Sequence, residues 1–474
     1  MNIRDEILSK IHDGYLVGGA IRDALLGKTT KDKDIAVKDA ESFAKKLAED
    51  FDGTFITLDC ENKIYRVVLE DKINFFDISE LQGETIEEDL KRRDFTINAI
   101  AYDLKTDEII DITGGIEDLK NGILRHIDEK NFEEDPLRIL RAFRFAATTG
   151  FKMTPELEEA IKKYLPLALN PAPERIHYEI MKLFGGAYTS QTLLKMDDFG
   201  LLEKIFPCII DMKKVPPNTH HHLDLFHHAV ETVRQIEIQY AKAGEEIKEH
   251  LDKIDFGGFP RINHLKLAGF LHDIGKFSTW TIEGGKCDKF ECLYNKPECV
   301  SCNARHRFIK HDDTGSKMVV PLLKELKFSK KQIEYISCMI KNHIYPSGVL
   351  AAPDFNEKVK MRYIRKMEDN VIDNIILARA DRLSARGVDV TDEMVKNNLD
   401  GLEALLNFYL EKRETLEPLP KLLDGNEIMS ILNIQPSPLL GKIVNALYEA
   451  QLNGDIADKN QAAAFIKDFY NANI

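Results

Sequence analysis

The sequence predicts an α+β N-terminal domain, a small mixed sheet with flanking helices, followed by all-α domains. Short β-branched and apolar runs bounded by turn residues, which are typical of strands, occur within residues 14–112. From Glu133 onward this pattern fades and helical periodicity takes over. The chain has 474 residues, which is too long for a single hydrophobic core, so about three domains are the starting expectation.

The elements can be assigned in chain order. Strands are expected in YLVGG, DIAV, GTFITL, IYRVVL and KINFFDI, and the intervening DAESFAKKLAEDF is typical of an amphipathic helix with an acidic start. DPLRILRAFRFAATTG predicts a helix with a proline near its start and Gly150 at its end. PAPERIHYEIMKLF repeats this pattern, and beyond residue 220 nearly everything outside a cysteine-containing segment is expected to be helical.

The composition indicates an ordinary globular protein, with 43% hydrophobic and 30% charged residues. No apolar run reaches the roughly 18 residues of a membrane helix, and the charged first ten residues lack the apolar stretch of a signal peptide. We therefore expect a cytoplasmic protein with no membrane partner. The net charge of −14 argues against a broad basic surface, but a polyanion could still bind a local basic strip.

Two aspartates lie close together near the N-terminus. Asp32 and Asp34 are two residues apart on a predicted strand, so their side chains share one face. Neighbouring carboxylates repel each other unless a cation offsets their charge, and oxygen ligands suit Mg²⁺. Asp77, in the strand NFFDIS, could supply a third carboxylate. The alternative is a solvated, charged turn, because D-x-D is common.

A glycine pair precedes these aspartates. Gly18 and Gly19 follow an apolar strand, and their backbone N–H groups can approach an anion closely. Arg22 falls in the expected first helical turn, where an anion is again favoured. A triphosphate held there would bring its metal to Asp32 and Asp34.

The whole stretch resembles the signature of the nucleotidyltransferase superfamily, in the bacterial class II branch of tRNA CCA-adding enzymes and poly(A) polymerases. EEDLKRRDFTINAIAYD (87–103), DITGGIEDLKNGILRHI (111–127) and FEEDPLRILRAFRFAA (132–147) are similar to its second motif, its connecting motif and its nucleotide-choosing helix. The resemblance implies template-independent addition of CCA to the 3′ end of tRNA from CTP and ATP, with release of pyrophosphate.

The resemblance also implies roles for the matching residues. The catalytic carboxylates would be Asp32, Asp34 and Asp77, with Mg²⁺ bound by Asp32 and Asp34. The nucleotide-binding residues would be Gly18, Gly19, Arg22, Arg93, Asp94, Asn98, Asp135, Arg138, Arg141 and Arg144. Asp135 and Arg138, expected as neighbours on one helix, would read the base edges of C and A. The alternative for this last pair is a plain helical ion pair.

A second group of residues combines histidine and aspartate with apolar helical surroundings, in LFHHAVETV, LAGFLHDIGK, RFIKHDD, IKNHI and LARADRLSA. Buried ionisable groups need partners, and a metal is an efficient one. The pattern H…HD…D resembles the HD phosphohydrolase superfamily. The resemblance implies a divalent transition metal held by His228, His272, Asp273, His311, His343 and Asp381. Phosphoester hydrolysis and a supporting structural role both stay open.

The segment CDKFECLYNKPECVSC interrupts this second group and holds Cys287, Cys292, Cys299 and Cys302. The last two cysteines have zinc-knuckle spacing, and the first two are one residue wider than the commonest form. A structural Zn²⁺ is one interpretation. An iron–sulfur cluster and free thiols are the others.

We therefore expect a nucleotidyltransferase domain over residues 1–128 and a helical, nucleotide-selecting and RNA-binding neck over 129–205. An HD domain with a cysteine-containing insertion at about 283–305 would cover 206–400, and a helical tail would cover 401–474. The tail either contacts tRNA or only caps the HD domain. The tail and the acidic net charge favour a tRNA enzyme over a poly(A) polymerase.

Residues 78–91, ISELQGETIEEDLK, are all that separates Asp77 from Arg92. In this family the region includes a flexible element needed to switch from C to A, and short forms occur in members that add only CC or only A. Complete addition, partial addition and poly(A) synthesis therefore stay open. A rival from another class is an HD phosphohydrolase whose N-terminal domain only binds nucleotides. The oligomeric state is unknown.

Overall fold

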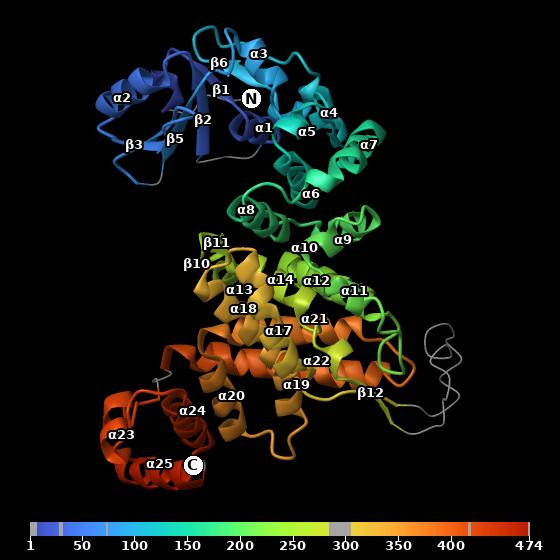
Figure 1. Ribbon diagram of the computed structural model, residues 1–474, viewed down its shortest axis with the longest axis vertical. Coiled ribbons are helices and arrows are strands. Elements are labelled where there is room, and N and C mark those ends of the chain that lie inside the picture. Colours follow the sequence, from blue (N-terminus) through green and yellow to red (C-terminus); the bar gives the residue numbers. More distant parts are fainter. Residues whose placement is uncertain (1–6, 28–31, 73, 284–304, 416–418, 473–474) are drawn as a thin grey trace. The chain divides into compact units, whose positions relative to one another are not determined.

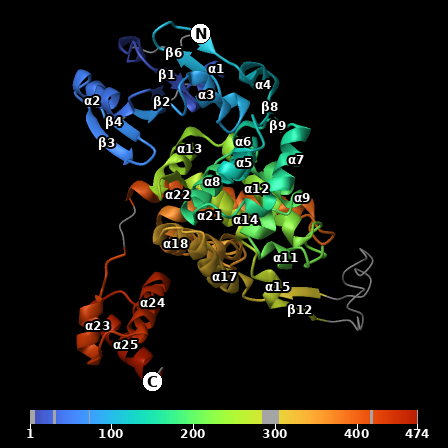
Figure 2. The ribbon, with the colours of Figure 1, turned by 45° about the horizontal axis from the view of Figure 1, so that its top comes forward.

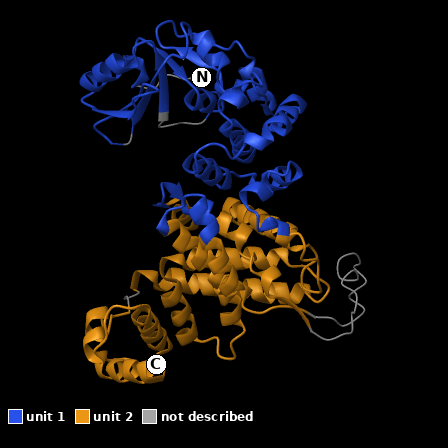
Figure 3. Cartoon of the chain, in the orientation of Figure 1, with its two compact units in different colours: residues 1–210, 254–264, 321–330 blue, residues 211–253, 265–320, 331–474 orange. Residues whose placement is uncertain are grey.

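The computed structural model describes residues 7–27, 32–72, 74–283, 305–415 and 419–472. The chain divides into two compact units, one of residues 1–210, 254–264 and 321–330 and the other of residues 211–253, 265–320 and 331–474 (Figure 3). Among the described residues, none of the helices combines the length and apolar character needed to span a bilayer.

A mixed sheet with strand order β3-β4-β5-β2-β1-β6-β7 forms the N-terminal part of the first unit (Figure 1). Its strands are β1 (Tyr15–Val17), β2 (Asp32–Val37), β3 (Thr54–Asp59), β4 (Ile64–Val68), β5 (Phe75–Glu80), β6 (Ala101–Asp103) and β7 (Ile109–Ile110). β2 and β5 are parallel, and the other neighbours are antiparallel. The five predicted strands are confirmed. The sequence analysis did not single out β6 and β7, which have three and two residues.

The two faces of this sheet have different roles. On one face, Ile35, Val67 and Phe76 are fully buried in a core, and α2 (Ala40–Asp50) packs against β4 and β5. Because side chains alternate along a strand, the residues between them point to the opposite face. That opposite face carries Asp34 and Asp77 and is partly covered by a smaller apolar cluster.

The remaining helices of the first unit follow the sheet in the chain. They are α1 (Gly19–Leu25), α3 (Ile86–Lys91), α4 (Gly115–Asn121), α5 (Asn131–Glu134), α6 (Leu137–Thr149), α7 (Pro155–Tyr164), α8 (Pro173–Phe184), α9 (Thr189–Asp198) and α10 (Leu202–Ile205). Short pairs also occur, β8 (Ile123–Leu124) with β9 (Lys152–Met153) and β10 (Ile254–Phe256) with β11 (Phe259–Pro260). The predicted helices at 135–150 and 171–184 are confirmed as α6 and α8. Gly150 ends α6 in the left-handed conformation, which glycine adopts without strain.

The second unit is built mainly of helices. They are α12 (Leu225–Lys242), α13 (Glu245–Asp252), α15 (Lys276–Thr279), α18 (Lys330–Asn342), α19 (Tyr345–Leu350), α20 (Glu357–Met367), α21 (Val371–Ser384), α22 (Asp392–Lys412), α23 (Gly425–Leu432), α24 (Pro438–Asn453) and α25 (Lys459–Ala472). Three more helices, α11 (Ile209–Met212), α14 (Arg261–Leu271) and α17 (His311–Glu325), contain residues of both units, as does α18, whose first residue, Lys330, belongs to the first unit. The hairpin of β12 (Trp280–Glu283) and β13 (Arg305–Phe308) is an exception to the expected helical content.

Two groups of helices can be distinguished within the second unit. α21 packs against α12 and α22, and its buried residues include Ile372, Ile375 and Leu377. The last three helices, α23, α24 and α25, form a small group of their own (Figure 2). This group encloses a separate core around Ile428 and Ile443. The expected fold class, an α+β domain followed by a helical remainder, is confirmed.

Candidate active site and candidate metal centre

The turn between β1 and α1 brings three parts of the first unit together. Gly18 has φ 69° and ψ −131°, a conformation that residues with a Cβ rarely adopt. A Cβ on Gly18 would lie 3.2 Å from Asp34 Oδ2 and 3.5 Å from Arg93 Nη1. The glycine turn, the carboxylate and the guanidinium therefore surround one small space, and Gly18 keeps that space open.

Asp34 and Asp77 stand side by side in the sheet. The register pairs Val17 with Asp34 and Asp34 with Asp77, so neighbouring strands bring these carboxylates into one row. Asp32 pairs with Phe75 at the start of β2, and its side chain lies outside the described residues.

Arg66 continues this row on β4, where it pairs with Asp77 in register. Its Nε donates to Asp77 Oδ1 and its Nη2 to Asp77 Oδ2, both at 2.7 Å. Its guanidinium also lies 4.2 Å from the centre of the Phe75 ring. The sequence analysis did not identify Arg66, because its partner is eleven residues away on another strand.

Arg93, Asp94 and Asn98 follow α3 and line the same region. Arg93 Nη2 lies 2.8 Å from Asp89 Oδ2. Asn98 donates from Nδ2 to Asp94 Oδ1 at 2.9 Å and accepts from Arg22 Nη1 at 2.7 Å. Asn98 therefore links the second predicted motif to the helix that follows the glycine turn.

Asp94 and Arg141 form a buried ion pair between this segment and α6. Arg141 Nη2 lies 2.6 Å from Asp94 Oδ2. Burial by itself would raise the pKa of Asp94, but Arg141 and the hydrogen bonds from Asn98 and from the backbone N–H of Phe95 outweigh burial and lower it to about 2. Asp94 is thus ionised throughout the neutral range.

Glu179 of α8 supports the two arginines of α6. Its Oε1 lies 3.4 Å from Arg141 Nη1, and its Oε2 lies 3.0 Å from Arg144 Nε. The side chain of Glu179 is 2% exposed. The sequence analysis missed it, although a glutamate on the apolar face of a predicted amphipathic helix is a detectable signal: Ile176 and Ile180, on the same face, are also buried.

The predicted base-reading residues are arranged differently from expectation. Asp135 has an extended backbone and precedes α6, so the predicted helical neighbourhood with Arg138 is wrong. Asp135 Oδ2 instead accepts from Arg175 Nη2 of α8 at 2.8 Å. Arg138 donates to the backbone carbonyls of Asn131 and Arg92, each at 2.7 Å. Pro136 is the reason, because a proline disfavours helical backbone at the preceding residue, so α5 ends before Asp135 and α6 begins after Pro136.

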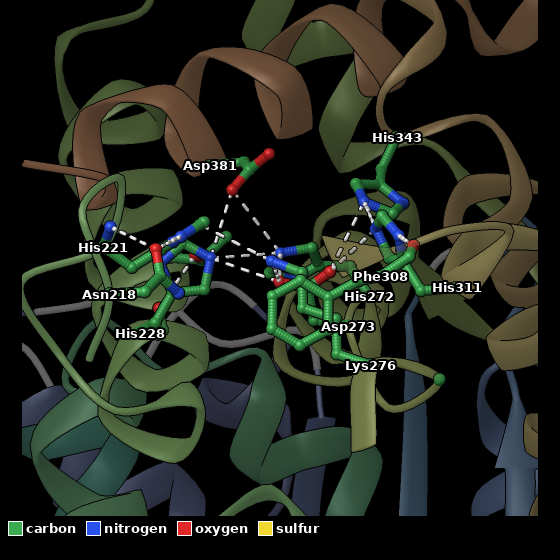
Figure 4. A network of polar contacts seen from close by, with 12 residues as sticks. Asn218, His221, His228, His272, Asp273, Lys276, Phe308, His311, His343 and Asp381 are labelled. Atoms are coloured by element: carbon green, nitrogen blue, oxygen red, sulfur yellow. Dashed lines mark hydrogen bonds and ion pairs between the residues drawn. The ribbon is translucent and has the colours of Figure 1, made fainter. Parts of the chain in front are cut away.

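A histidine–aspartate centre lies in the second unit (Figure 4). Asp273 connects its two halves. One carboxylate oxygen, Oδ2, lies 3.5 Å and 3.1 Å from the Nε2 atoms of His228 and His272. The other, Oδ1, lies 3.2 Å and 3.5 Å from those of His311 and His343. All six residues predicted for this centre converge: His228, His272, Asp273, His311, His343 and Asp381.

Backbone carbonyls determine which nitrogen of these histidines faces the centre. The Nδ1 atoms of His272, His311 and His343 lie 2.6–2.7 Å from the carbonyls of Gly269, Phe308 and Ile340. Such a contact places the proton on Nδ1 and leaves the Nε2 lone pair directed inward. The facing Nε2 atoms of each histidine pair are 3.2–3.3 Å apart. The Nε2 lone pairs of His311 and His343 are thus directed at one another and need a cation between them, so this donor set fits a divalent metal.

The electrostatics of this centre also favour positive charge. Burial lowers the pKa of His272, but Asp273 and Asp381 outweigh it and raise that pKa to about 10, so the two carboxylates favour a cation at its Nε2, either a proton or a metal ion. Lys276 Nζ lies 2.6 Å from Asp273 Oδ2 and 3.4 Å from His221 Nε2. His221 was not predicted as part of the centre. It precedes the helix that carries His228, and its position next to the His228 ring comes from a loop that has no periodic pattern.

Cys287, Cys292, Cys299 and Cys302 lie outside the described residues, between β12 and β13. Among the described residues, the clusters of three or more histidine, cysteine, aspartate or glutamate side chains that could hold a metal ion belong to the histidine–aspartate centre. The three described cysteines, Cys60, Cys208 and Cys338, form no disulfide.

Three family models match consecutive parts of the chain. The family model of the Poly A polymerase head domain matches residues 14–125, that of the probable RNA and SrmB-binding site of polymerase A matches 150–212, and that of the HD domain matches 226–386. Fold and sites together define a nucleotidyltransferase that carries an HD domain.

Two curated relatives match nearly the whole chain. The A-adding tRNA nucleotidyltransferase of Deinococcus radiodurans is 30% identical over 461 residues, which are 95% of this chain and 94% of that protein. The CC-adding tRNA nucleotidyltransferase of Thermus thermophilus is 29% identical, over 96% of this chain and 93% of that protein. The chain belongs to the tRNA nucleotidyltransferase family.

A solved structure supports the fold assignment. The CCA-adding enzyme of Thermotoga maritima, complexed with tRNA, is 21% identical, with a TM-score of 0.51 over 96% of this chain and 91% of that one. At this identity the likeness concerns the fold.

Proposed function

We propose that the chain adds the nucleotides of the CCA sequence to the 3′ end of tRNA, using CTP and ATP and releasing pyrophosphate. The observation that carries this proposal is the space around Gly18, which Asp34 and Arg93 border and which a Cβ would fill. The family assignment and the two full-length tRNA nucleotidyltransferase relatives support it.

In this proposal the glycine turn and Arg22 hold the triphosphate, because free backbone N–H groups and a guanidinium favour an anion. Asp32 and Asp34 would hold Mg²⁺, and Asp77 lies next to Asp34 in the same row of the sheet. Carboxylate oxygens suit this ion, and Asp34 Oδ2 faces the glycine turn that would hold the triphosphate. When bound, Mg²⁺ would activate the 3′-hydroxyl and neutralise charge on the leaving pyrophosphate.

Asp135, just before α6, and three arginines of α6 would select and orient the nucleotide. Asp135 can accept from the exocyclic amine of C or A, and Arg138 can donate to a ring nitrogen or to the carbonyl of C. Arg141 and Arg144 would face the nucleotide while Asp94 and Glu179 hold them in place. Because little covalent chemistry falls to the protein in such a transfer, positioning and charge supply most of the rate enhancement.

For the second unit we propose a divalent-metal site that hydrolyses a phosphoester. Asp273 would serve as a ligand on both sides of the centre, because each of its two carboxylate oxygens faces a different histidine pair. Lys276, close to Asp273 Oδ2, is suited to hold a substrate phosphate.

A second candidate, partial addition, is favoured by specific observations. Only the five residues 81–85 connect β5 to α3, and this connection is tied to α3, with the N–H of Gln82 donating to Asp89 Oδ1 and that of Glu84 to Glu88 Oε2. Both full-length relatives are named as partial adders, one of A and one of CC. A chain with this connection could add only CC or only A.

Incorporation on three tRNA transcripts, ending before CCA, after C and after CC, tests the proposal. Each is offered labelled CTP or ATP with Mg²⁺, and an Asp32→Ala/Asp34→Ala double variant is the control. Incorporation of C and of one A, lost in the control, supports complete addition. Incorporation of only C or only A identifies a partial adder. Long A tails would indicate poly(A) polymerase, and no incorporation at all would leave the HD domain as the working site.

A further inference from the structure

Arg66 occupies a defined place relative to the proposed active site. It lies on β4, pairs in register with Asp77 on β5, and Asp77 pairs in register with Asp34 on β2. Residues paired in register on neighbouring strands point to the same face of a sheet. With strands about 4.8 Å apart, the Cα of Arg66 lies about 10 Å from that of Asp34. Arg66 is thus the cation at one end of the carboxylate row.

The surroundings of Arg66 fix its guanidinium but leave it accessible. Two hydrogen bonds of 2.7 Å join it to both oxygens of Asp77, and the Phe75 ring lies against it at 4.2 Å. The Arg66 side chain is nevertheless 33% exposed. A guanidinium has five N–H donors, so one that is oriented by a carboxylate can also bind a phosphate oxygen.

The order of the strands indicates which substrate would approach Arg66. Asp34 lies between the glycine turn after β1 and the Asp77–Arg66 pair on β5 and β4. In phosphoryl transfer the attacking and leaving oxygens lie roughly in line. If the triphosphate is held at the glycine turn, the attacking 3′-hydroxyl arrives from the opposite side of Asp34. That is the side on which Arg66 lies.

We propose that Arg66 is a further substrate-contacting residue, whose guanidinium, oriented by Asp77, binds a backbone phosphate near the 3′ end of the acceptor RNA strand. The inference rests on the nucleotidyl transfer proposed above. It adds the side from which the RNA end enters and the residue that meets it.

The test compares Arg66→Ala and Arg66→Lys with the wild-type chain. The control is Lys63→Gln, which removes an ion pair with Glu80 of 2.6 Å at the far end of the same two strands. The nucleotide and the tRNA transcript are those that the wild-type chain uses. KM is measured separately for that nucleotide, CTP or ATP, and for that transcript. RNA affinity is measured by fluorescence anisotropy without nucleotide between 50 and 300 mM KCl, in the usual range for such salt titrations.

We expect Arg66→Ala to raise KM for the RNA about 10- to 100-fold, as for loss of a hydrogen bond to a charged group. KM for the nucleotide should change less than about twofold. The slope of log affinity against log salt should fall by about 0.7 to 0.9, equivalent to one phosphate contact. Arg66→Lys should retain the salt slope and recover part of the affinity, and Lys63→Gln should match the wild type.

An unchanged RNA affinity and salt slope in Arg66→Ala would overturn the inference, and so would a rise in KM for the nucleotide alone. A uniform loss of kcat with both KM values unchanged would also overturn it, because that pattern indicates only a structural role. Failure of the proposed function has a different readout, namely no incorporation of C or A by the wild-type chain.

Discussion

Arg141 reaches from α6 to Asp94, with 2.6 Å between Nη2 and Oδ2, and so joins the nucleotide-choosing helix to the segment that follows α3. Glu179 approaches the same arginine from α8. The carboxylate of this pair is buried, with the Asp94 side chain 6% exposed, whereas the Arg141 side chain is 30% exposed. A charge buried in this way depends on its partner, so each member of this network should be sensitive to substitution.

Asp94→Asn should destabilise the first unit by about 2 kcal/mol at pH 7, since the shift from 3.8 to about 2 spans nearly two pKa units. The folded pKa is depressed, so this contribution is fully present above pH 3.8 and is lost as the pH falls toward 2. The stability difference between wild type and variant should therefore stay constant from pH 8 to pH 5 and shrink below pH 4. Hydrogen exchange of the α6 amides over this pH range measures the stability difference. A difference that grows on acidification would contradict the prediction.

Gly18→Ala should reduce kcat/KM about 100-fold, equivalent to about 2.7 kcal/mol of transition-state stabilisation. The new Cβ would enter the space beside Asp34 Oδ2. Gly114→Ala is the matched control, because Gly114 also has a positive φ, 78°, yet a Cβ there meets nothing within 4 Å. Steady-state kinetics and melting temperatures of both variants separate crowding of the site from backbone strain. Equal losses of activity would argue against a functional role for the space at Gly18.

Glu179→Gln should raise KM for the nucleotide at least about tenfold, because Arg141 and Arg144 lose a buried carboxylate that orients them. Glu174→Gln, at an exposed position of the same helix, is the control and should leave KM unchanged. Nucleotide titrations at saturating RNA provide the measurement. If both variants behave as wild type, Glu179 does not position the arginines for nucleotide binding.

Asp135→Ala should reduce discrimination of C and A against U and G by about 10-fold or more, because removing one hydrogen-bonding group from a base-reading pair costs about 1–3 kcal/mol. Arg175→Ala should weaken discrimination less, since it removes only the partner of Asp135 Oδ2. Competition between labelled CTP and UTP on one transcript measures the ratio. Retained discrimination in Asp135→Ala would mean that other groups read the base.

His228→Ala should lower the metal content of the purified protein at least about tenfold. The substitution removes one ligand from the centre and leaves His272 without its partner histidine. His227→Ala is a close control, since His227 is the neighbouring residue on α12, is half exposed and pairs with Asp224. Elemental analysis after dialysis, together with the melting temperature with and without a chelator, measures the effect. Equal metal contents in the two variants would contradict a metal site at His228.

Metal bound by the cysteines of the segment CDKFECLYNKPECVSC would also be counted in this elemental analysis. A Cys299→Ser/Cys302→Ser variant should lose zinc and keep the metal of the histidine–aspartate centre, if the predicted structural Zn²⁺ exists. Zinc that stays at the wild-type level in this variant would argue against a cysteine-bound zinc.

Local patterns explain what could be predicted. Strands β1 to β5 were predicted because short apolar and β-branched runs bounded by turn residues are visible within a few residues. The helices α6 and α8 were predicted from their periodicity and from proline and glycine at their ends. Turn glycines and closely spaced aspartates are equally local. The resemblance of these motifs to a known family then connected them.

Contacts between distant segments could not be predicted in this way. Asp135 meets Arg175 across forty residues, and His250 meets Asp373 across 123. Arg66, Glu179 and His221 acquire their roles only from residues on other elements. The spacing of neighbouring residues can mark Glu179 as buried, but it does not identify the partner of any of the three.

By itself, the sequence determined the α+β start, the helical remainder, the carboxylate row and the six residues of the histidine–aspartate centre. The tertiary structure alone decided which group each charged side chain meets: Arg66 with Asp77, Glu179 with two arginines, and Asp135 with Arg175. The physical reason is that hydrophobic periodicity acts over a few residues. Ion pairs instead form wherever packing brings charges together, and packing is a property of the whole fold.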